Sequence, residues 1–303
     1  MPNTLAHIGI NAVLTRPLIK KADILLIYFG AIIPDIPWIV QRIVSFALPD
    51  LNPYDLRLYC VVQTTLFFSL IFSLAISILL RESLKAFIIL MVGAFLHLIL
   101  DSLEKKWANG VHLFAPLNWD LFNAGFFWPE NIIVQLLGIL GLICFISLWK
   151  KSLITMIRLD WKNKKKLTVF FFIVITYVFL PFVFLQSAED ADNHFVGTLR
   201  NSHERDAKYF EVDRGKYVDL KNGDIFLTPF DDTLFVKNIN LTSSEIISIR
   251  AKFTSKNEIQ IIEYHIHGDR DIYSYAGLSL VFILVFYRTL RITLTRNKKD
   301  KLF

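Results

Sequence analysis

The chain has 303 residues, of which 54% are hydrophobic and 14% aromatic, and its mean hydropathy is +0.46. A composition this apolar excludes an ordinary soluble domain and indicates an integral membrane protein. The formal net charge of +6 lies in separate clusters between apolar runs. We interpret these clusters as basic loops at a membrane surface and expect no nucleic-acid partner. Both cysteines lie inside apolar runs and predict neither a disulfide framework nor a cysteine metal site.

The first candidate element is residues 3–16, NTLAHIGINAVLTR, whose apolar positions recur at near-helical spacing. This segment is too short to cross a bilayer, which takes about 20 apolar residues. We therefore predict a short re-entrant or interfacial helix that carries His7 into the membrane. No small-residue cleavage site follows an apolar core, so we expect no cleavable signal peptide.

The next element, residues 22–47, is an apolar run interrupted at its centre by IPDIP. Pro34 and Pro37 prevent regular helical hydrogen bonding around Asp35. By helix rise, Asp35 lies in the outer half of the bilayer. A carboxylate in a broken helix at that depth is costly unless it lines a polar cavity, so the pattern predicts such a cavity.

The remaining apolar runs complete an α-helical polytopic membrane protein with about six spans. These runs are residues 58–80, 86–101, 131–149, 167–186 and 274–291. Basic clusters occur at 16–21, 81–85, 150–166 and 288–301. The positive-inside rule places these four clusters and both chain ends in the cytoplasm, which predicts a multi-pass protein of the cell (inner, cytoplasmic) membrane.

Two segments are expected outside the cytoplasm. Residues 102–130 form an outer loop rich in Trp and Phe, which should lie on the membrane surface among the lipids. Residues 188–272 are polar and then alternate in six short strands, which predicts a small extracytoplasmic antiparallel β domain, either a sandwich or an OB-like barrel. The chain then divides into a membrane domain (1–187), the β domain (188–272) and a final span with a basic tail (273–303).

One pair of residues, His97 and Asp101, is a candidate pair of metal ligands. His97 and Asp101 are four residues apart, so they share one face of a helix, and Gly93 one turn earlier allows a neighbouring helix to approach closely. An imidazole and a carboxylate on adjacent turns can chelate one metal ion. The alternative interpretation is structural, with the histidine in a helix-to-helix hydrogen bond and the aspartate at a helix end.

Three further ligand-type residues reach the same level of the membrane under this topology: His7, Asp35 and His112. Ionisable residues inside a membrane are rare and usually functional. Convergence of the group therefore favours a metal site at the outer half of the bilayer.

Four short motifs occur in order in the first 116 residues: TLAHIG (4–9), GAIIPDI (30–36), HLILD (97–101) and GVHLFAP (110–116). In these motifs the chain resembles the YdjM-like membrane-bound metal-dependent hydrolases. The resemblance implies a divalent metal ion held by His7, Asp35, His97 and Asp101, with His112 as a fifth residue. From the ligand types, zinc is the expected metal. The resemblance does not supply a substrate.

The chain departs from the family pattern after the broken helix. Where the family has a Thr-His-Ser stretch, this chain reads DLRLYCVVQTTLFFSL, with Gln63 and no histidine. An amide is a much poorer metal ligand than an imidazole. Replacement ligands are available in EYHIHGD, where His265 and His267 would face one side of a strand near the level of Asp101. The alternative is that both histidines lie on a solvated strand face.

The leading hypothesis is therefore a membrane-embedded metal-dependent hydrolase at the outer face of the membrane, acting on a lipid or lipid-linked substrate, either an ester or a phosphoester. The metal would activate a water, with a spare carboxylate or histidine, such as Asp35 or His112, as general base. Two alternatives remain open. One is a non-catalytic scaffold that binds a protein partner and has a degenerate metal site. The other is an ion or small-solute transporter, because a broken helix also suits that role.

Overall fold

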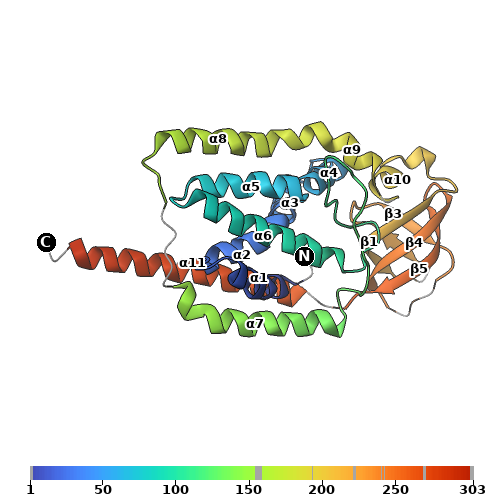
Figure 1. Ribbon diagram of the computed structural model, residues 1–303. Helices are drawn as coiled ribbons and strands as arrows, with labels where there is room; N and C mark the ends of the chain where they lie inside the picture. The colour runs from blue at the N-terminus through green and yellow to red at the C-terminus, as the bar shows by residue number, and fades with distance from the viewer. Residues whose placement is uncertain are drawn as a thin grey trace.

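The computed structural model describes residues 3–153, 159–192, 194–220, 223–239, 241, 243–268 and 271–300. It consists of a bundle of helices with a small β-barrel at one end (Figure 1). In the described part of the chain, five helices are long and apolar enough to cross a membrane: Ile24–Ala47, Ser83–Ser102, Ile132–Ser152, Lys164–Asp190 and Ile272–Arg291. A bent helix pair adds a sixth if it counts as one span. The expected helical domain with several apolar candidate spans and a separate small β domain is confirmed.

The first helix, α1 (Thr4–Leu18), begins at Asn3, whose side chain accepts a hydrogen bond from the backbone N–H of Ala6. Its 15 residues reach about 22 Å at 1.5 Å per residue, less than the roughly 30 Å of a bilayer core. The helix packs on α7 (Ile132–Ser152) with no side chain between Gly9 and Gly141. The short, buried N-terminal helix predicted from the sequence is therefore present.

The second apolar run is broken where the prolines predict. Helix α2 (Ile24–Ile32) passes through a 3₁₀ turn, η1 (Ile33–Asp35), into α3 (Ile36–Ala47). The break leaves Asp35 only 2% exposed, among the helices.

The predicted span 58–80 is not one straight helix. It consists of α4 (Pro53–Gln63) and α5 (Leu66–Ile78), which meet at 71°. The side chain of Thr65 caps α5 by accepting a hydrogen bond from the N–H of Phe68, so a new helix starts in the middle of the apolar run. Apolar content alone did not reveal this break.

Helix α6 (Ser83–Ser102) lies directly against α2. A Cβ atom on Gly93 would lie 2.8 Å from the Cα of Gly30, so the two backbones touch. This is the close approach that Gly93 predicts, and it brings the next turn of α6 to the end of α2.

The other helices are α8 (Lys164–Phe179), η2 (Leu180–Phe184), α9 (Leu185–Asp190), α10 (Val196–Arg200), η3 (Ser202–Glu204) and α11 (Asp271–Asp300). The basic turns gather at the end of the bundle away from the barrel (Figure 1). There Lys166 donates to the carbonyl of Leu80 at 2.8 Å, and Arg288 of α11 pairs with Asp23 at 3.0 Å. This is the arrangement required by a topology with the basic loops on one side and the β domain on the other.

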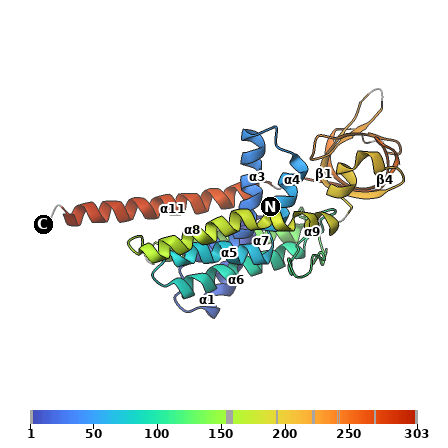
Figure 2. The ribbon, with the colours of Figure 1, turned by 90° about the horizontal axis from the view of Figure 1, so that it is seen from above.

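The β domain is a closed five-stranded barrel with the strand order β1-β2-β3-β5-β4. The strands are β1 (Tyr209–Val218), β2 (Ile225–Leu227), β3 (Thr233–Val236), β4 (Glu245–Ser255) and β5 (Glu258–Ile266). Figure 2 shows the barrel end-on beside the helices. All neighbouring strands are antiparallel except β3 and β5, which are parallel, so the purely antiparallel expectation needs correction.

Five strands are present where six were expected, because the first two predicted strands form one strand. The ladder between β1 and β4 shifts register between Val212 and Gly215, and Arg214 there has a positive φ of 63°. This is a bulge, and its charged and glycine residues resemble a turn in the sequence.

Part of the aromatic loop lies against the barrel. Trp107 is 2% exposed and meets the edge of Trp128 at 5.0 Å between ring centroids. The guanidinium of Arg250, on β4, lies 4.8 Å from the Trp107 ring. These indoles therefore pack at the junction between the bundle and the barrel. Leu117 and Phe126 are the most exposed apolar side chains of the loop, at 96% and 74%, and Phe114 and Phe122 are exposed as well.

The contact between α2 and α6 gives a test of the fold. Gly93→Ala places a methyl group against the Gly30 backbone and should cost about 1–3 kcal/mol by overpacking, seen as a lower melting temperature of the detergent-purified protein. Gly197→Ala, in α10, is the matched control because the nearest atom to its Cβ is 3.8 Å away. Equal melting temperatures for the two variants would contradict a direct backbone contact.

Candidate metal centre

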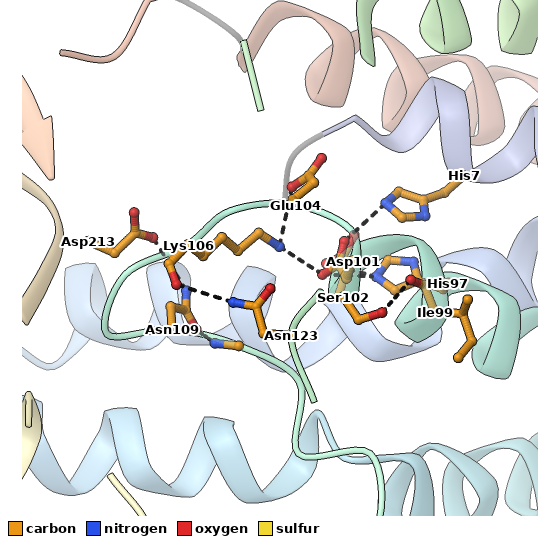
Figure 3. A network of polar contacts seen from close by, with 12 residues as sticks. His7, His97, Ile99, Asp101, Ser102, Glu104, Lys106, Asn109, Asn123 and Asp213 are labelled. Carbon is orange, nitrogen blue, oxygen red and sulfur yellow. Dashed lines mark hydrogen bonds and ion pairs between the residues drawn. The ribbon is translucent and has the colours of Figure 1, made fainter. Parts of the chain in front are cut away.

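Three of the predicted ligands meet at the barrel end of the bundle: His7 from α1, and His97 and Asp101 from α6. One ligand atom of each lies within 4.8 Å of the others. His7 Nε2 is 3.3 Å from Asp101 Oδ1, and His97 Nε2 is 3.8 Å from Asp101 Oδ2. The imidazole rings stack at 4.0 Å, and both point toward Asp101 (Figure 3). We call these residues the triad.

The orientation of His97 is set by α2. Its Nδ1 lies 2.6 Å from the carbonyl oxygen of Ala31. A carbonyl only accepts, so Nδ1 carries the hydrogen and Nε2 presents its lone pair to the carboxylates. Metal-binding histidines commonly have this arrangement, in which the second nitrogen donates to a backbone carbonyl.

Asp35 lies beside the triad. Its Oδ1 is 3.6 Å from His97 Nε2, while Oδ2 is buried without a hydrogen-bond partner among the described residues. His7 Nδ1 is also buried without a hydrogen-bond partner among the described residues. The negative charge of the two carboxylates around His97 would be balanced by a cation, which would also provide a partner for the unsatisfied buried atoms. The residues present therefore fit a divalent metal ion.

Lys106 is part of the site and was missed in the sequence, where it was assigned to the outer loop. Its Nζ lies 3.2 Å from Asp101 Oδ2 and 3.4 Å from Glu104 Oε2 (Figure 3). The signal was the charged run EKK that follows Asp101 within one loop. A lysine at this position offsets part of the negative charge of the carboxylates.

A cavity of about 560 Å³ opens beside the triad, between α3, the 102–130 loop and the barrel. Asp35, His97 and Asp101 form part of its wall. The rest of the wall is strongly basic and includes Arg42, Arg57, Lys106 and Arg214. Acidic metal-ligand candidates and cationic side chains therefore face the same space.

His112 lines this cavity but does not belong to the triad. Its Nδ1 lies 2.6 Å from the carbonyl of Trp119, so Nδ1–H donates and Nε2 carries the lone pair. Burial lowers the pKa of His112, which keeps the imidazole neutral and able to accept a proton at pH 7.

Gln63 lies away from the triad. Its Nε2 donates to the Tyr59 hydroxyl at 3.0 Å and to the Tyr177 carbonyl on α8 at 3.2 Å. The amide of Gln63 therefore joins α4 to α8. Its neighbour Thr64 is the residue that lines the cavity.

His265 and His267 gather with Glu130 into a second group and not with the triad. The structure thus divides the predicted ligands between two clusters. No family model matches the chain, and no curated protein and no solved structure matches it either. The geometry and the chemistry of these residues therefore carry the functional argument.

The triad predicts a measurable metal content. His97→Ala combined with Asp101→Ala removes two of three ligands and should lower the divalent metal in the purified protein by about one equivalent per chain. His112→Gln is the matched control, because it changes a cavity histidine outside the triad. Elemental analysis after gel filtration is the measurement. The same metal content in the double variant and the wild type would contradict the assignment.

Proposed function

We propose that this protein is a membrane metal-dependent hydrolase that acts on a phosphate ester of a lipid. The observation that carries the proposal is one cavity whose wall contains two residues of the triad, His97 and Asp101, together with four cationic side chains. The resemblance to YdjM-like hydrolases supports the same reaction class through His7, Asp35, His97 and Asp101. A divalent ion held by the triad, with zinc the expected one, would act as a Lewis acid and make a nearby water a better nucleophile at neutral pH.

The cationic side chains favour a phosphate over an uncharged ester. The guanidinium of Arg57 is held between Trp38 and Phe195, at 5.0 and 5.2 Å from their ring centroids. Its Nε is buried and makes no hydrogen bond to any described residue. Arg57 thus offers a fixed, directional donor to phosphate oxygens, which planar guanidinium groups bind well. Lys106 and Arg42, on other sides of the cavity, add positive charge.

Two groups are available for proton transfer. His112 presents a neutral Nε2, and Asp35 presents a carboxylate oxygen without a hydrogen-bond partner in the described structure. Either can take the proton of the attacking water, which is the role of a general base. Asp101 is less suited to this role because Lys106 and His7 already pair with it.

Helix α3 favours a lipid substrate. Val40, Ile43 and Phe46 are 47%, 62% and 90% exposed. Gln41 and Arg42, on the same helix, line the cavity. A headgroup in the cavity would leave its hydrocarbon chain beside this exposed apolar face, where burial contributes about 25 cal/mol per Å².

The proposed location follows from charge. The basic turns lie opposite the barrel, so the positive-inside rule puts the barrel and the cavity at the outer face of the cytoplasmic membrane. The barrel has the strand number of an OB fold, which supports the OB-like expectation.

The activity can be tested with two phosphate-ended lipids in detergent micelles, phosphatidic acid and a polyprenyl phosphate. Zinc-loaded protein should release inorganic phosphate from at least one, and His97→Ala with Asp101→Ala should abolish the release. Arg57→Gln should raise KM roughly tenfold or more, because hydrogen bonds to charged groups contribute about 1.5–3 kcal/mol, and should leave the metal content unchanged. No phosphate release from either lipid by metal-loaded protein would refute this substrate class.

The orientation can be tested with single cysteines and a membrane-impermeant maleimide on intact cells. Leu220→Cys, near the barrel, should react, whereas Leu84→Cys, at the basic end of α6, should react only after permeabilisation; the original side chains are 46% and 74% exposed. A variant without Cys60 and Cys144 provides the background. The opposite labelling pattern would invert the proposed topology.

A further inference from the structure

The second cluster joins the barrel to the start of α7. Glu130 lies immediately before α7, and His265 and His267 lie at the end of β5. Glu130 Oε1 is 2.6 Å from His267 Nδ1, and Oε2 is 3.4 Å from His265 Nε2. One ligand atom from each of the three residues lies within 4.8 Å of the others. The segments are more than a hundred residues apart in the chain, so the sequence did not indicate the role of Glu130.

The hydrogen bonds around Ser248 decide which nitrogen of His267 carries a proton. Ser248 Oγ lies 2.9 Å from Asp213 Oδ1 and accepts from the N–H of Arg214 at 3.1 Å. A carboxylate only accepts, so the single hydroxyl proton of Ser248 goes to Asp213. The 2.7 Å contact between Ser248 Oγ and His267 Nε2 must then be donated by His267.

It follows that His267 Nδ1 has only its lone pair to present to Glu130 when the ring is neutral. Two acceptors at 2.6 Å repel each other unless a positive charge lies between them. A second proton on His267 supplies that charge at the observed separation. A metal ion supplies it once the two atoms move apart enough for bonds of about 2.0–2.2 Å to each. A donor set of two imidazoles and a carboxylate is the one that zinc binds in proteins.

The surroundings are those of a built site. The His267 side chain is 1% exposed, and the Glu130 and His265 side chains are 19% and 26% exposed, so solvent can reach one side. Trp128 stacks on His265 with the ring centroids 3.7 Å apart and the planes within 2°, which holds that imidazole in place. The donation from His267 to Ser248 is the outer hydrogen bond that metal-binding histidines commonly make.

We propose that Glu130, His265 Nε2 and His267 Nδ1 bind a second divalent metal ion of the zinc class, which fastens the barrel to the bundle. The site also bears on the cavity, because Ser248 connects His267 to Asp213 and to the backbone of Arg214, two residues of the cavity wall. A metal bound here would hold Asp213 and Arg214 in place in the cavity wall. This inference stands on its own contacts and does not depend on the hydrolase proposal.

The test uses the full chain purified in detergent and loaded with zinc or cobalt(II) alone. His265→Asn should lower the bound metal by about one equivalent and reduce the visible absorption of the cobalt form, which tetrahedral coordination strengthens. His203→Asn is the matched control, since His203 is an exposed histidine near the barrel. Gel filtration and far-ultraviolet circular dichroism verify that each variant is folded, and Glu130→Gln gives a second, milder change at the same site.

Combination with the triad variant separates the two sites. Wild type should hold about two equivalents, either site variant about one, and the combined variant none. Loss with His265→Asn but not with the triad variant would support this site while refuting the triad. Folded His265→Asn and Glu130→Gln proteins that both keep the metal content of the wild type would overturn the inference and leave an imidazolium–carboxylate pair at this position.

Discussion

The candidate site depends on one contact, in which α2 and α6 meet backbone to backbone at Gly30 and Gly93. Only at that separation can His97, one turn after Gly93, reach the carbonyl of Ala31. The hydrogen bond fixes the tautomer of the imidazole and turns Nε2 toward Asp35 and Asp101. Inside an apolar bundle such a bond also satisfies groups that would be costly to bury alone.

The segment between α6 and α7 connects the two halves of the molecule. It supplies Lys106 to the triad, His112 to the cavity wall and Glu130 to the second cluster. Its indoles, Trp107 and Trp128, occupy the junction with the barrel. Side-chain contacts on both sides hold this segment, which has no regular secondary structure, so the segment links the bundle to the barrel. The proposed substrate site lies at the junction, where a headgroup can meet side chains from both halves.

The features predictable from sequence were the local ones. A period of 3.6 residues puts His97 and Asp101 on one face, and Pro34 and Pro37 break the helix at Asp35, whatever the rest of the fold does. The helix-rise argument also predicted His7 at the same level, and His7 does lie beside Asp101 in the structure.

Features set by tertiary contacts could not be predicted from the sequence. Glu130 meets β5 across a separation of more than a hundred residues, and nothing in its own neighbourhood marks it as a ligand. The bulge at Arg214 imitates a turn, because a charged residue and a glycine have the same local signature in both. The bend before α5 is set by Thr65, a residue that also fits an uninterrupted span.

The packing of α11 on α1 links the site to the order of synthesis. A Cβ on Gly277 would lie 2.8 Å from the backbone nitrogen of Leu5, so α11 covers the turn that carries His7. The buried pair between Arg288 and Asp23 secures it at the other end. At 5–20 residues per second, some 270 residues separate these helices by tens of seconds of translation. The candidate metal centre of the nascent protein is therefore incomplete until the barrel has been synthesised and α11 has packed on α1.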